Sequence, residues 1–297
     1  MNSVLVSGNA LWQWQQQAKQ QAIAAKIPLQ EVDWLLQELA GLDRLSLRLE
    51  TYRSQTVSLK VSLETLSDCW QQRLADRVPV QYLAGVAPWR QFLLHVTPAV
   101  LIPRPETEML IDLAQSAVQL HPSLATGHWV DLGTGSGAIA IGLADSFPDA
   151  QIHAVDYSEA ALAVAQWNAR QCGFGDRIQF YRGSWFEPIA HLQGQLSGMV
   201  SNPPYIPQGI IADLQPEVAR HEPHLALDGG TDGLDAVRHL INTAPFYLRS
   251  GGLWLVELMA DQAAIVADLL DAAGSYTEIQ IHADLAGIDR FVMAYRG

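Results

Sequence analysis

The stretch Val130–Ala138, with the sequence VDLGTGSGA, decides the fold of most of this chain. Apolar residues lead into it and a helical pattern follows it, so its three glycines stand at a strand-to-helix turn. Glycine lets the backbone turn sharply and approach a ligand closely, and the amides that open the next helix favour electronegative groups. The stretch therefore predicts a nucleotide-like ligand at the carboxyl end of a buried strand.

The residues around this stretch alternate between strand and helix patterns. The strand candidates are His128–Leu132, Gln151–Asp156, Arg177–Tyr181, Gly198–Asn202, Gly252–Leu258, Thr277–His282 and Asp289–Tyr295. The helical segments between them are Ala138–Ser146, Glu159–Cys172 behind a Ser158 cap, Leu234–Leu248 and Asp261–Ala273. Such alternation predicts a mainly parallel sheet covered on both faces. Because Ala283–Ile288 is too short for a parallel crossover, the last two strands are expected to be antiparallel.

The first part of the chain has a different pattern. Leu29–Ala40 places apolar residues on one helical face, and Ser62 can cap a second amphipathic helix over Leu63–Arg77. Glycine and proline interrupt residues 82–103, which suits a hairpin or an extended linker. We therefore expect a helical domain over residues 1–80, a hairpin linker over 81–103 and an α/β domain over 104–297.

Composition limits the class of protein. The chain has 297 residues, of which 49% are apolar and 16% charged, so it is globular rather than disordered. No apolar run approaches the roughly 20 residues of a membrane span, and the start has no secretory pattern. Two cysteines, Cys69 and Cys172, cannot form a disulfide framework or a zinc site. These features predict a cytoplasmic protein that is not bound to a membrane and holds no metal.

The charge distribution bears on the partners. Residues 1–100 carry 9 basic and 8 acidic side chains, whereas residues 101–297 carry 9 basic and 23 acidic ones. A domain with a net charge of −14 repels a phosphate backbone unless it hides a basic groove. No basic run of the nucleic-acid-binding type occurs in the sequence. Direct binding of nucleic acid is therefore not expected.

The glycines alone leave two ligand classes open. Gly133, Gly135 and Ala138 also satisfy the dinucleotide pattern of a nicotinamide-dependent oxidoreductase, with Asp156 placed to hold a ribose. Asp131 favours S-adenosylmethionine, because a carboxylate there suits a cationic ligand better than a pyrophosphate. Trp185 follows the third strand, where it can stack on adenine or belong to the core.

The run Asn202–Tyr205, with the sequence NPPY, ends a further strand. The side-chain oxygen of Asn202 and the carbonyl of Pro203 can accept both N–H bonds of a planar NH2 group. Proline at 203 and 204 fixes the backbone, and Tyr205 offers a flat face for stacking. This pattern indicates methyl transfer to an amide or aromatic amine, with catalysis by positioning and polarisation and without an acidic or histidine base.

At this point the sequence resembles a known family, the glutamine methyltransferases of peptide chain release factors, often called HemK or PrmC. The resemblance covers nearly the whole chain and rests on four runs: Leu101–Glu108, Asp131–Gly137, Asn202–Tyr205 and Glu222–Leu234. It implies a small all-helical domain and a β-hairpin linker, followed by a seven-stranded, Rossmann-like class I methyltransferase domain. It also implies that S-adenosyl-L-methionine provides the methyl group for the glutamine amide in the Gly-Gly-Gln motif of class 1 release factors. The helical domain would then dock that protein substrate.

Carried onto this sequence, the resemblance assigns the site residues. The cofactor contacts would be Gly133, Thr134, Gly135, Ser136, Gly137, Asp156, Trp185 and Asn202, to which the position of Asp131 adds a ninth. The substrate amide would meet Asn202, Pro203, Pro204 and Tyr205, with Asn202, Pro203 and Tyr205 as the catalytic group. Ser184 and Met259 depart from residues usual in the family, and the first 25 residues match it loosely.

Three alternatives remain open from the sequence. A nucleic-acid methyltransferase acting on adenine or guanine shares the NPPY run but normally brings a basic surface. A nicotinamide-dependent oxidoreductase would leave that run unexplained. A binding module without catalysis would require both motifs to be incidental. The pair His221 and His224 is expected to be a loop or surface feature rather than a metal site.

Overall fold

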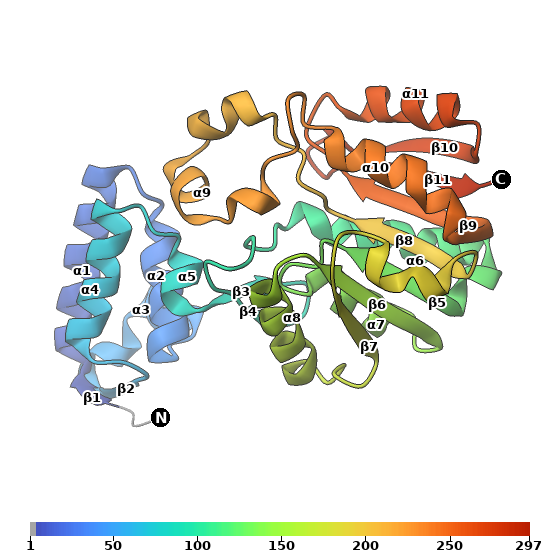
Figure 1. Ribbon diagram of the computed structural model, residues 1–297. Coiled ribbons are helices and arrows are strands. Elements are labelled where there is room, and N and C mark those ends of the chain that lie inside the picture. Colours follow the sequence, from blue (N-terminus) through green and yellow to red (C-terminus); the bar gives the residue numbers. More distant parts are fainter. Residues whose placement is uncertain (1–3) are drawn as a thin grey trace. The chain divides into compact units, whose positions relative to one another are not determined.

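The computed structural model describes residues 4–297, which form two compact units (Figure 1). The smaller unit contains the chain up to Val86 together with the short segment Pro216–His221. The larger unit contains Ala87–Gln215 and Glu222–Gly297. A segment from the second half of the sequence thus belongs to the compact unit formed by the first part.

The larger unit is built on a seven-stranded sheet with the order β10-β11-β9-β8-β5-β6-β7. Its strands are β5 (Gly127–Leu132), β6 (Ala150–Asp156), β7 (Ile178–Arg182), β8 (Leu196–Ser201), β9 (Leu248–Glu257), β10 (Tyr276–Ala283) and β11 (Asp289–Arg296). The pairs among β5, β6, β7, β8 and β9 are parallel, whereas β11 runs antiparallel to both β9 and β10. The expected antiparallel pairing of the last two strands is confirmed.

Helices cover both faces of this sheet, as Figure 1 shows. They are α6 (Met109–Leu120), α7 (Ala138–Ser146), α8 (Glu159–Gln171), α10 (Asp235–Thr243) and α11 (Ala263–Ala273). Successive strand residues point to opposite faces, so Leu253 and Leu255 join the core that contains α6 and α7. Trp254 and Val256 join the core that contains α10 and α11. Burial on both faces explains why these strands are continuous apolar runs in the sequence.

The smaller unit is mainly helical. Its helices are α1 (Gly8–Ala25), α2 (Leu29–Ala40), α3 (Arg44–Leu49), α4 (Leu63–Ala75), α5 (Val80–Ala84) and α9 (Pro216–His221). The expected Ser62 cap is present, since its hydroxyl accepts the Thr65 amide at 3.0 Å. The unit also holds a two-stranded antiparallel sheet of β1 (Val4–Ser7) and β2 (Thr56–Leu59), which the sequence pattern did not predict. Four-residue strands give too short an alternation to be recognised.

A hairpin-like pair of strands lies where the sequence predicted one. β3 (Val86–Trp89) and β4 (Phe92–His95) form a two-stranded sheet within residues 82–103. The Asn168 side chain holds β4, because its Oδ1 accepts the His95 amide at 2.7 Å and its Nδ2 donates to the His95 carbonyl at 2.9 Å. These bonds attach the end of β4 to α8, and Asn168 Nδ2 also donates to the Ser136 carbonyl of the glycine loop at 2.9 Å.

Candidate functional site

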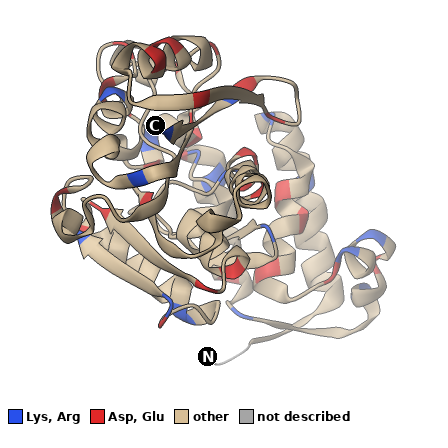
Figure 2. Cartoon of the chain, turned by 90° about the vertical axis from the view of Figure 1, so that its right-hand side faces the viewer, with Lys and Arg blue, Asp and Glu red and all other residues tan. Residues whose placement is uncertain are grey.

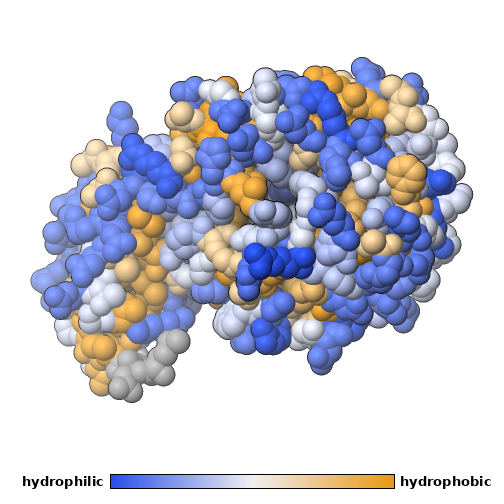
Figure 3. Space-filling model, in the orientation of Figure 1, coloured by the Kyte–Doolittle hydropathy of each residue, from blue (hydrophilic) through white to orange (hydrophobic). Residues whose placement is uncertain are grey.

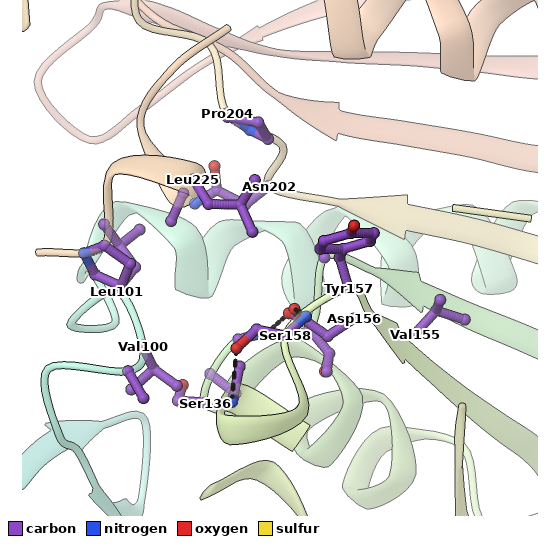
Figure 4. A pocket seen from close by; sticks show the side chains of 18 of the residues that line it. Val100, Leu101, Ser136, Val155, Asp156, Tyr157, Ser158, Asn202, Pro204 and Leu225 are labelled. Carbon is purple, nitrogen blue, oxygen red and sulfur yellow. Dashed lines mark hydrogen bonds between the residues drawn. The ribbon is translucent and has the colours of Figure 1, made fainter. Parts of the chain in front are cut away.

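A cavity of about 480 Å3 opens at the carboxyl ends of the parallel strands in the larger unit. Ligands of open α/β sheets bind at this edge, and the volume suits a small organic ligand. Figure 4 shows Ser136, Asp156 and Ser158 on one side of the cavity and Asn202 and Leu225 on the other. The two motifs that the sequence singled out therefore border one space.

The glycine loop, residues 133–137, leaves β5 and enters α7. The amides of Gly133 and Thr134 donate to the Val155 carbonyl at 2.9 and 3.0 Å, which ties the loop to β6. Gly133 has a φ of +76°, a conformation that glycine adopts without strain. The loop residues that line the cavity are Gly133, Thr134, Gly135 and Ser136. This arrangement presents a close backbone surface to a ligand, as the sequence predicted.

Gly137 has a packing role instead. It is not among the cavity-lining residues, and a Cβ at this position would come within 3.1 Å of the Ala165 side chain on α8. Its φ is +83°. Glycine at 137 therefore allows the start of α7 to pack closely against α8, and the expected contact of this residue with the cofactor stays a prediction.

Asp156 ends β6 and lines the cavity. Its Oδ2 accepts the Gly135 amide and its Oδ1 accepts the Ser158 amide, both at 2.8 Å. Burial raises the pKa of Asp156, opposed by these backbone bonds. Each carboxylate oxygen keeps a further lone pair for a ligand. A pair of ribose hydroxyls fits such an acceptor.

Trp185 lies near the glycine loop. A Cβ on Gly133 would be 3.8 Å from the Trp185 ring, and Trp185 itself lines the cavity. Its φ is +49°, which is unfavourable for a bulky side chain and costs on the order of 1–3 kcal/mol. Strained residues of this kind concentrate at functional sites, and no pattern in the sequence indicates the strain.

Asp131 lies behind the glycine loop. It is fully buried and is not among the residues that line the cavity. Its Oδ2 accepts the Thr134 hydroxyl at 2.6 Å and the Ala140 amide at 3.0 Å, so it holds the loop to the start of α7. Burial raises the pKa of Asp131 to about 7. These bonds use only Oδ2, so the expected contact with a cationic ligand stays a prediction.

The Asn-Pro-Pro-Tyr segment, Asn202–Tyr205, follows β8. Ser201, which ends that strand, donates its hydroxyl to the Leu132 carbonyl at 2.6 Å and so joins the ends of β8 and β5. Asn202 and Pro204 line the cavity, whereas Pro203 and Tyr205 are not among the lining residues. The Gln262 side chain donates to the Tyr205 carbonyl at 3.0 Å. The structure thus brings Asn202 to the glycine loop but leaves the stacking role of Tyr205 a prediction.

A buried carboxyl group stands behind this segment. Glu257 ends β9, is 2% exposed, and accepts the Tyr205 hydroxyl at 3.4 Å. Burial raises the pKa of Glu257 to about 7, opposed by the Thr107 hydroxyl, Arg290 and Tyr205. Burial also raises the pKa of Tyr205. No motif in the sequence pointed to Glu257 as part of the site.

The remaining wall of the cavity comes from two runs that carried the family resemblance. Leu101, Pro103 and Arg104 contribute from the first, and Pro223, Leu225 and Ala226 from the second. Arg104 donates to Glu222 at 2.6 Å, and the Glu222 side chain is only 1% exposed. Figure 3 shows a hollow with apolar side chains beside it. This ion pair joins the two runs, whose other lining residues are mostly apolar.

The described residues, 4–297, carry basic and acidic side chains that lie among one another. Figure 2 shows Lys and Arg scattered among Asp and Glu. Within residues 4–297, no cluster of three or more His, Cys, Asp or Glu side chains is arranged to hold a metal ion. In the same part of the chain, no helix is both long and apolar enough to cross a membrane.

Comparison with known proteins decides the family. A family model described as "Methyltransferase small domain" matches residues 107–218. The release factor glutamine methyltransferase of Synechocystis sp. is 55% identical over 99% of both chains. The chain belongs to the release factor glutamine methyltransferase family. The enzyme of the same name from Thermosynechococcus vestitus is 51% identical and covers 97% of this chain and 99% of its own.

Solved structures support the fold of this methyltransferase. The hMettl16 catalytic domain, in complex with MAT2A 3′UTR hairpin 6, matches with a TM-score of 0.54. That match covers 80% of this chain and 84% of the other, at 14% identity. Such low identity shows a shared fold alone. The class I methyltransferase fold implied by the family resemblance is confirmed. Membership of the release factor glutamine methyltransferase family excludes the oxidoreductase and binding-module alternatives.

Proposed function

We propose that this enzyme methylates the side-chain amide of the glutamine in the Gly-Gly-Gln motif of class 1 peptide chain release factors. The observation that carries the proposal is that Asn202 and Asp156 border one cavity. The Asn202 side chain is suited to a planar amide, and the Asp156 carboxylate is suited to a ribose. The names of relatives at 45–55% identity over nearly the whole chain support this substrate.

S-adenosyl-L-methionine is the proposed methyl donor. The geometry described above fits it: Asp156 would accept its ribose hydroxyls, the backbone of the glycine loop would lie close against it, and Trp185 would border the adenine. When bound, this cofactor supplies a methyl group on a positively charged sulfur. Asp131 and Gly137 would support the site from outside the cavity.

The enzyme's own residues would act by holding the amide nitrogen. An amide nitrogen is a weak nucleophile because its lone pair is delocalised into the carbonyl. Asn202 Oδ1 and the Pro203 carbonyl would accept the two N–H bonds, so that negative charge gathers on the nitrogen as it reacts. The rigid Pro203–Pro204 backbone keeps these acceptors in place. The methylated nitrogen then loses its extra proton readily, so no dedicated base is needed.

The helical unit is the proposed docking surface for the release factor. Leu45 and Leu49 on α3 are 64% and 60% exposed, and residues four apart share one face of a helix. Replacing both with Ser is expected to raise KM for an intact release factor several-fold and to leave KM for a short Gly-Gly-Gln peptide unchanged. An unchanged KM for the intact protein would place docking elsewhere.

The test of the proposed function offers three acceptors to the enzyme with methyl-labelled S-adenosylmethionine. A purified release factor, total RNA and DNA are incubated separately, and label in each is counted. We expect label in the release factor, and none after its glutamine is changed to glutamate, which has no NH2 group. Label in RNA or DNA alone would favour a nucleic-acid methyltransferase, which shares the Asn-Pro-Pro-Tyr segment.

A further inference from the structure

The amide of Asn202 has two ends of nearly equal shape but opposite hydrogen-bonding character. Only Oδ1 can accept an N–H bond from a substrate amide, whereas Nδ2 can only donate. A clamp built on Asn202 therefore requires something that keeps Nδ2 turned away from the cavity. The substrate cannot provide this control before it binds, so the control must come from the protein.

Thr107 is in contact with the nitrogen end. The Asn202 Nδ2 donates to Thr107 Oγ1 at 3.1 Å, and Thr107 is 4% exposed on η2 (Glu106–Glu108). A hydroxyl can donate as well as accept, so Thr107 alone would tolerate either orientation of the Asn202 amide. The orientation is determined only if another acceptor takes the Thr107 proton.

Glu257 is the acceptor available to Thr107. The Thr107 hydroxyl lowers the pKa of this carboxyl group, and the Tyr205 hydroxyl donates to Oε1 at 3.4 Å. Its Oε2 is buried and has no partner of normal hydrogen-bond length among residues 4–297. This oxygen has unused lone pairs that can accept the Thr107 proton. An ionised carboxylate only accepts, so it sets the direction of every bond in the chain.

We propose that Thr107 and Glu257 are positioning residues, which together hold the Asn202 amide with its oxygen toward the cavity. The bonds then run in one direction, from Asn202 Nδ2 to Thr107 and from the Thr107 hydroxyl to Glu257. The Tyr205 hydroxyl anchors the same carboxylate, which connects both ends of the Asn-Pro-Pro-Tyr segment to one buried charge. The inference rests on the proposed function, because it concerns the same amide clamp.

The state of Glu257 controls the direction of these bonds. A protonated Glu257 can donate to Thr107, whose own proton is then free to bond Asn202 Oδ1. The side-chain amide of Asn202 then flips, so that Nδ2 faces the cavity. Arg290 and Tyr205 favour the charged form of Glu257, whereas Glu106 opposes it. Because its pKa is raised to about 7, turnover is expected to fall as the pH drops below that value.

The experiment compares Thr107→Val, which keeps the shape and removes the hydroxyl, with Thr107→Ser, which keeps the hydroxyl. Loss of one hydrogen bond predicts a single-turnover rate on the order of tenfold lower for Thr107→Val. Thr107→Ser is expected within about twofold of the wild type, and cofactor Kd is expected within about twofold for both. If Thr107 had only a structural role, the rate of each variant would fall in proportion to its loss of unfolding free energy. Equal rates in the wild type and in Thr107→Val would overturn the inference.

A second readout does not depend on activity. In a nitrogen–proton NMR spectrum, the Asn202 side-chain amide is assigned by its absence in Asn202→Ala. One of its two protons is expected to exchange slowly with solvent in the wild type and in Thr107→Ser, and rapidly in Thr107→Val. Slow exchange in Thr107→Val would contradict the proposed contact. If the wild type fails to methylate the release factor, the proposed function fails, and this spectrum still decides the orientation of Asn202.

Glu257→Gln provides a variant that does not alter Thr107. It replaces the ionisable group with a neutral one of the same shape, so the fall in turnover below pH 7 is expected to disappear. The rate above pH 7 is expected to drop on the order of tenfold, since one hydrogen-bond direction is no longer enforced. An unchanged pH profile would exclude Glu257 from the positioning network.

Discussion

On the glycine-loop side, the cavity is lined by the backbone of Gly133–Ser136 and by the Asp156 carboxylate, which the Gly135 amide holds. On the opposite side it is lined by Asn202 together with Thr107, to which the Asn202 side chain is bonded. Backbone held by a strand and a helix is rigid without further support. A side chain needs neighbours to fix its orientation, and the structure provides them from η2 and β9. The glycine-loop side is thus suited to binding the cofactor, and the Asn202 side is suited to holding the reacting amide.

Asn202→Ala is expected to have the largest effect. It removes an acceptor whose bond strengthens as charge develops on the substrate nitrogen, and such losses cost on the order of 100- to 1,000-fold in rate. Cofactor Kd is expected to change only a few-fold, because Asp156 and the glycine loop lie on the other side. Single-turnover assays and calorimetry measure the two quantities. Asn202→Asp, which keeps an acceptor and adds a charge near the sulfonium, is expected to bind cofactor and turn over slowly.

Asp156→Asn is expected to show the opposite pattern. The variant keeps the size of the side chain but loses the charge that accepts the proposed ribose hydroxyls, so cofactor Kd should rise about 10- to 100-fold. Once cofactor is saturating, the rate is expected to stay within a few-fold of the wild type. Calorimetric titration with S-adenosylhomocysteine checks this. A Kd equal to that of the wild type would remove Asp156 from the binding side.

Tyr205→Phe is expected to have a smaller effect. The ring and its packing remain, and only the bond to Glu257 is lost, so the rate should fall several-fold at most. Tyr205→Ala also removes the ring and is expected to be clearly slower. The comparison uses steady-state rates at saturating cofactor. Equal losses in both variants would mean that the hydroxyl matters more than the ring.

Asp131→Asn is expected to have the smallest effect on function. Because Asp131 bonds to the loop and does not line the cavity, cofactor Kd should stay within about twofold of the wild type. A rise in cofactor Kd as large as that of Asp156→Asn would support the direct contact between Asp131 and the cofactor that the sequence predicts.

The same variant is expected to change how stability depends on pH. The folded chain keeps the Asp131 proton up to about pH 7, whereas the unfolded chain loses it near 3.8, so wild-type stability falls as pH rises between these values. Asparagine removes this loss, which amounts to about 1.4 kcal/mol for each unit of pKa shift. Urea unfolding at pH 5 and pH 7.5 measures it. If the unfolding free energies of the wild type and of Asp131→Asn changed equally between these pH values, the raised pKa of Asp131 would be contradicted.

The two sides of the cavity also differ in how far the sequence predicted them. The glycine loop and Asp156 depend on local geometry at two strand ends, which periodicity and glycine spacing indicate. Asn202 and Thr107 are 95 positions apart, and Tyr205 and Glu257 are 52 apart. Such pairs depend on which strand ends are neighbours in the folded sheet, and a single sequence does not give this.

Asp131 shows a second limit of the sequence. Its position beside the glycines is compatible with a side chain that points into the cavity or one that points into the core. In the structure the Ala140 amide of α7 bonds one of its oxygens, Oδ2, which no local sequence pattern indicates. The strand boundaries were predicted to within a few residues because apolar runs end where burial ends. The strand pair β1–β2 was missed because pairing across about fifty residues leaves no local signal.

The most direct test is the single-turnover rate of methyl transfer to a release factor at saturating cofactor, measured side by side for Asp156→Asn and Asn202→Ala. If the cavity divides binding from reaction as proposed, Asp156→Asn stays within a few-fold of the wild type while Asn202→Ala falls at least about 100-fold. Equal rates for the two variants, or a near-normal rate for Asn202→Ala, would contradict the division and show that the amide is held elsewhere.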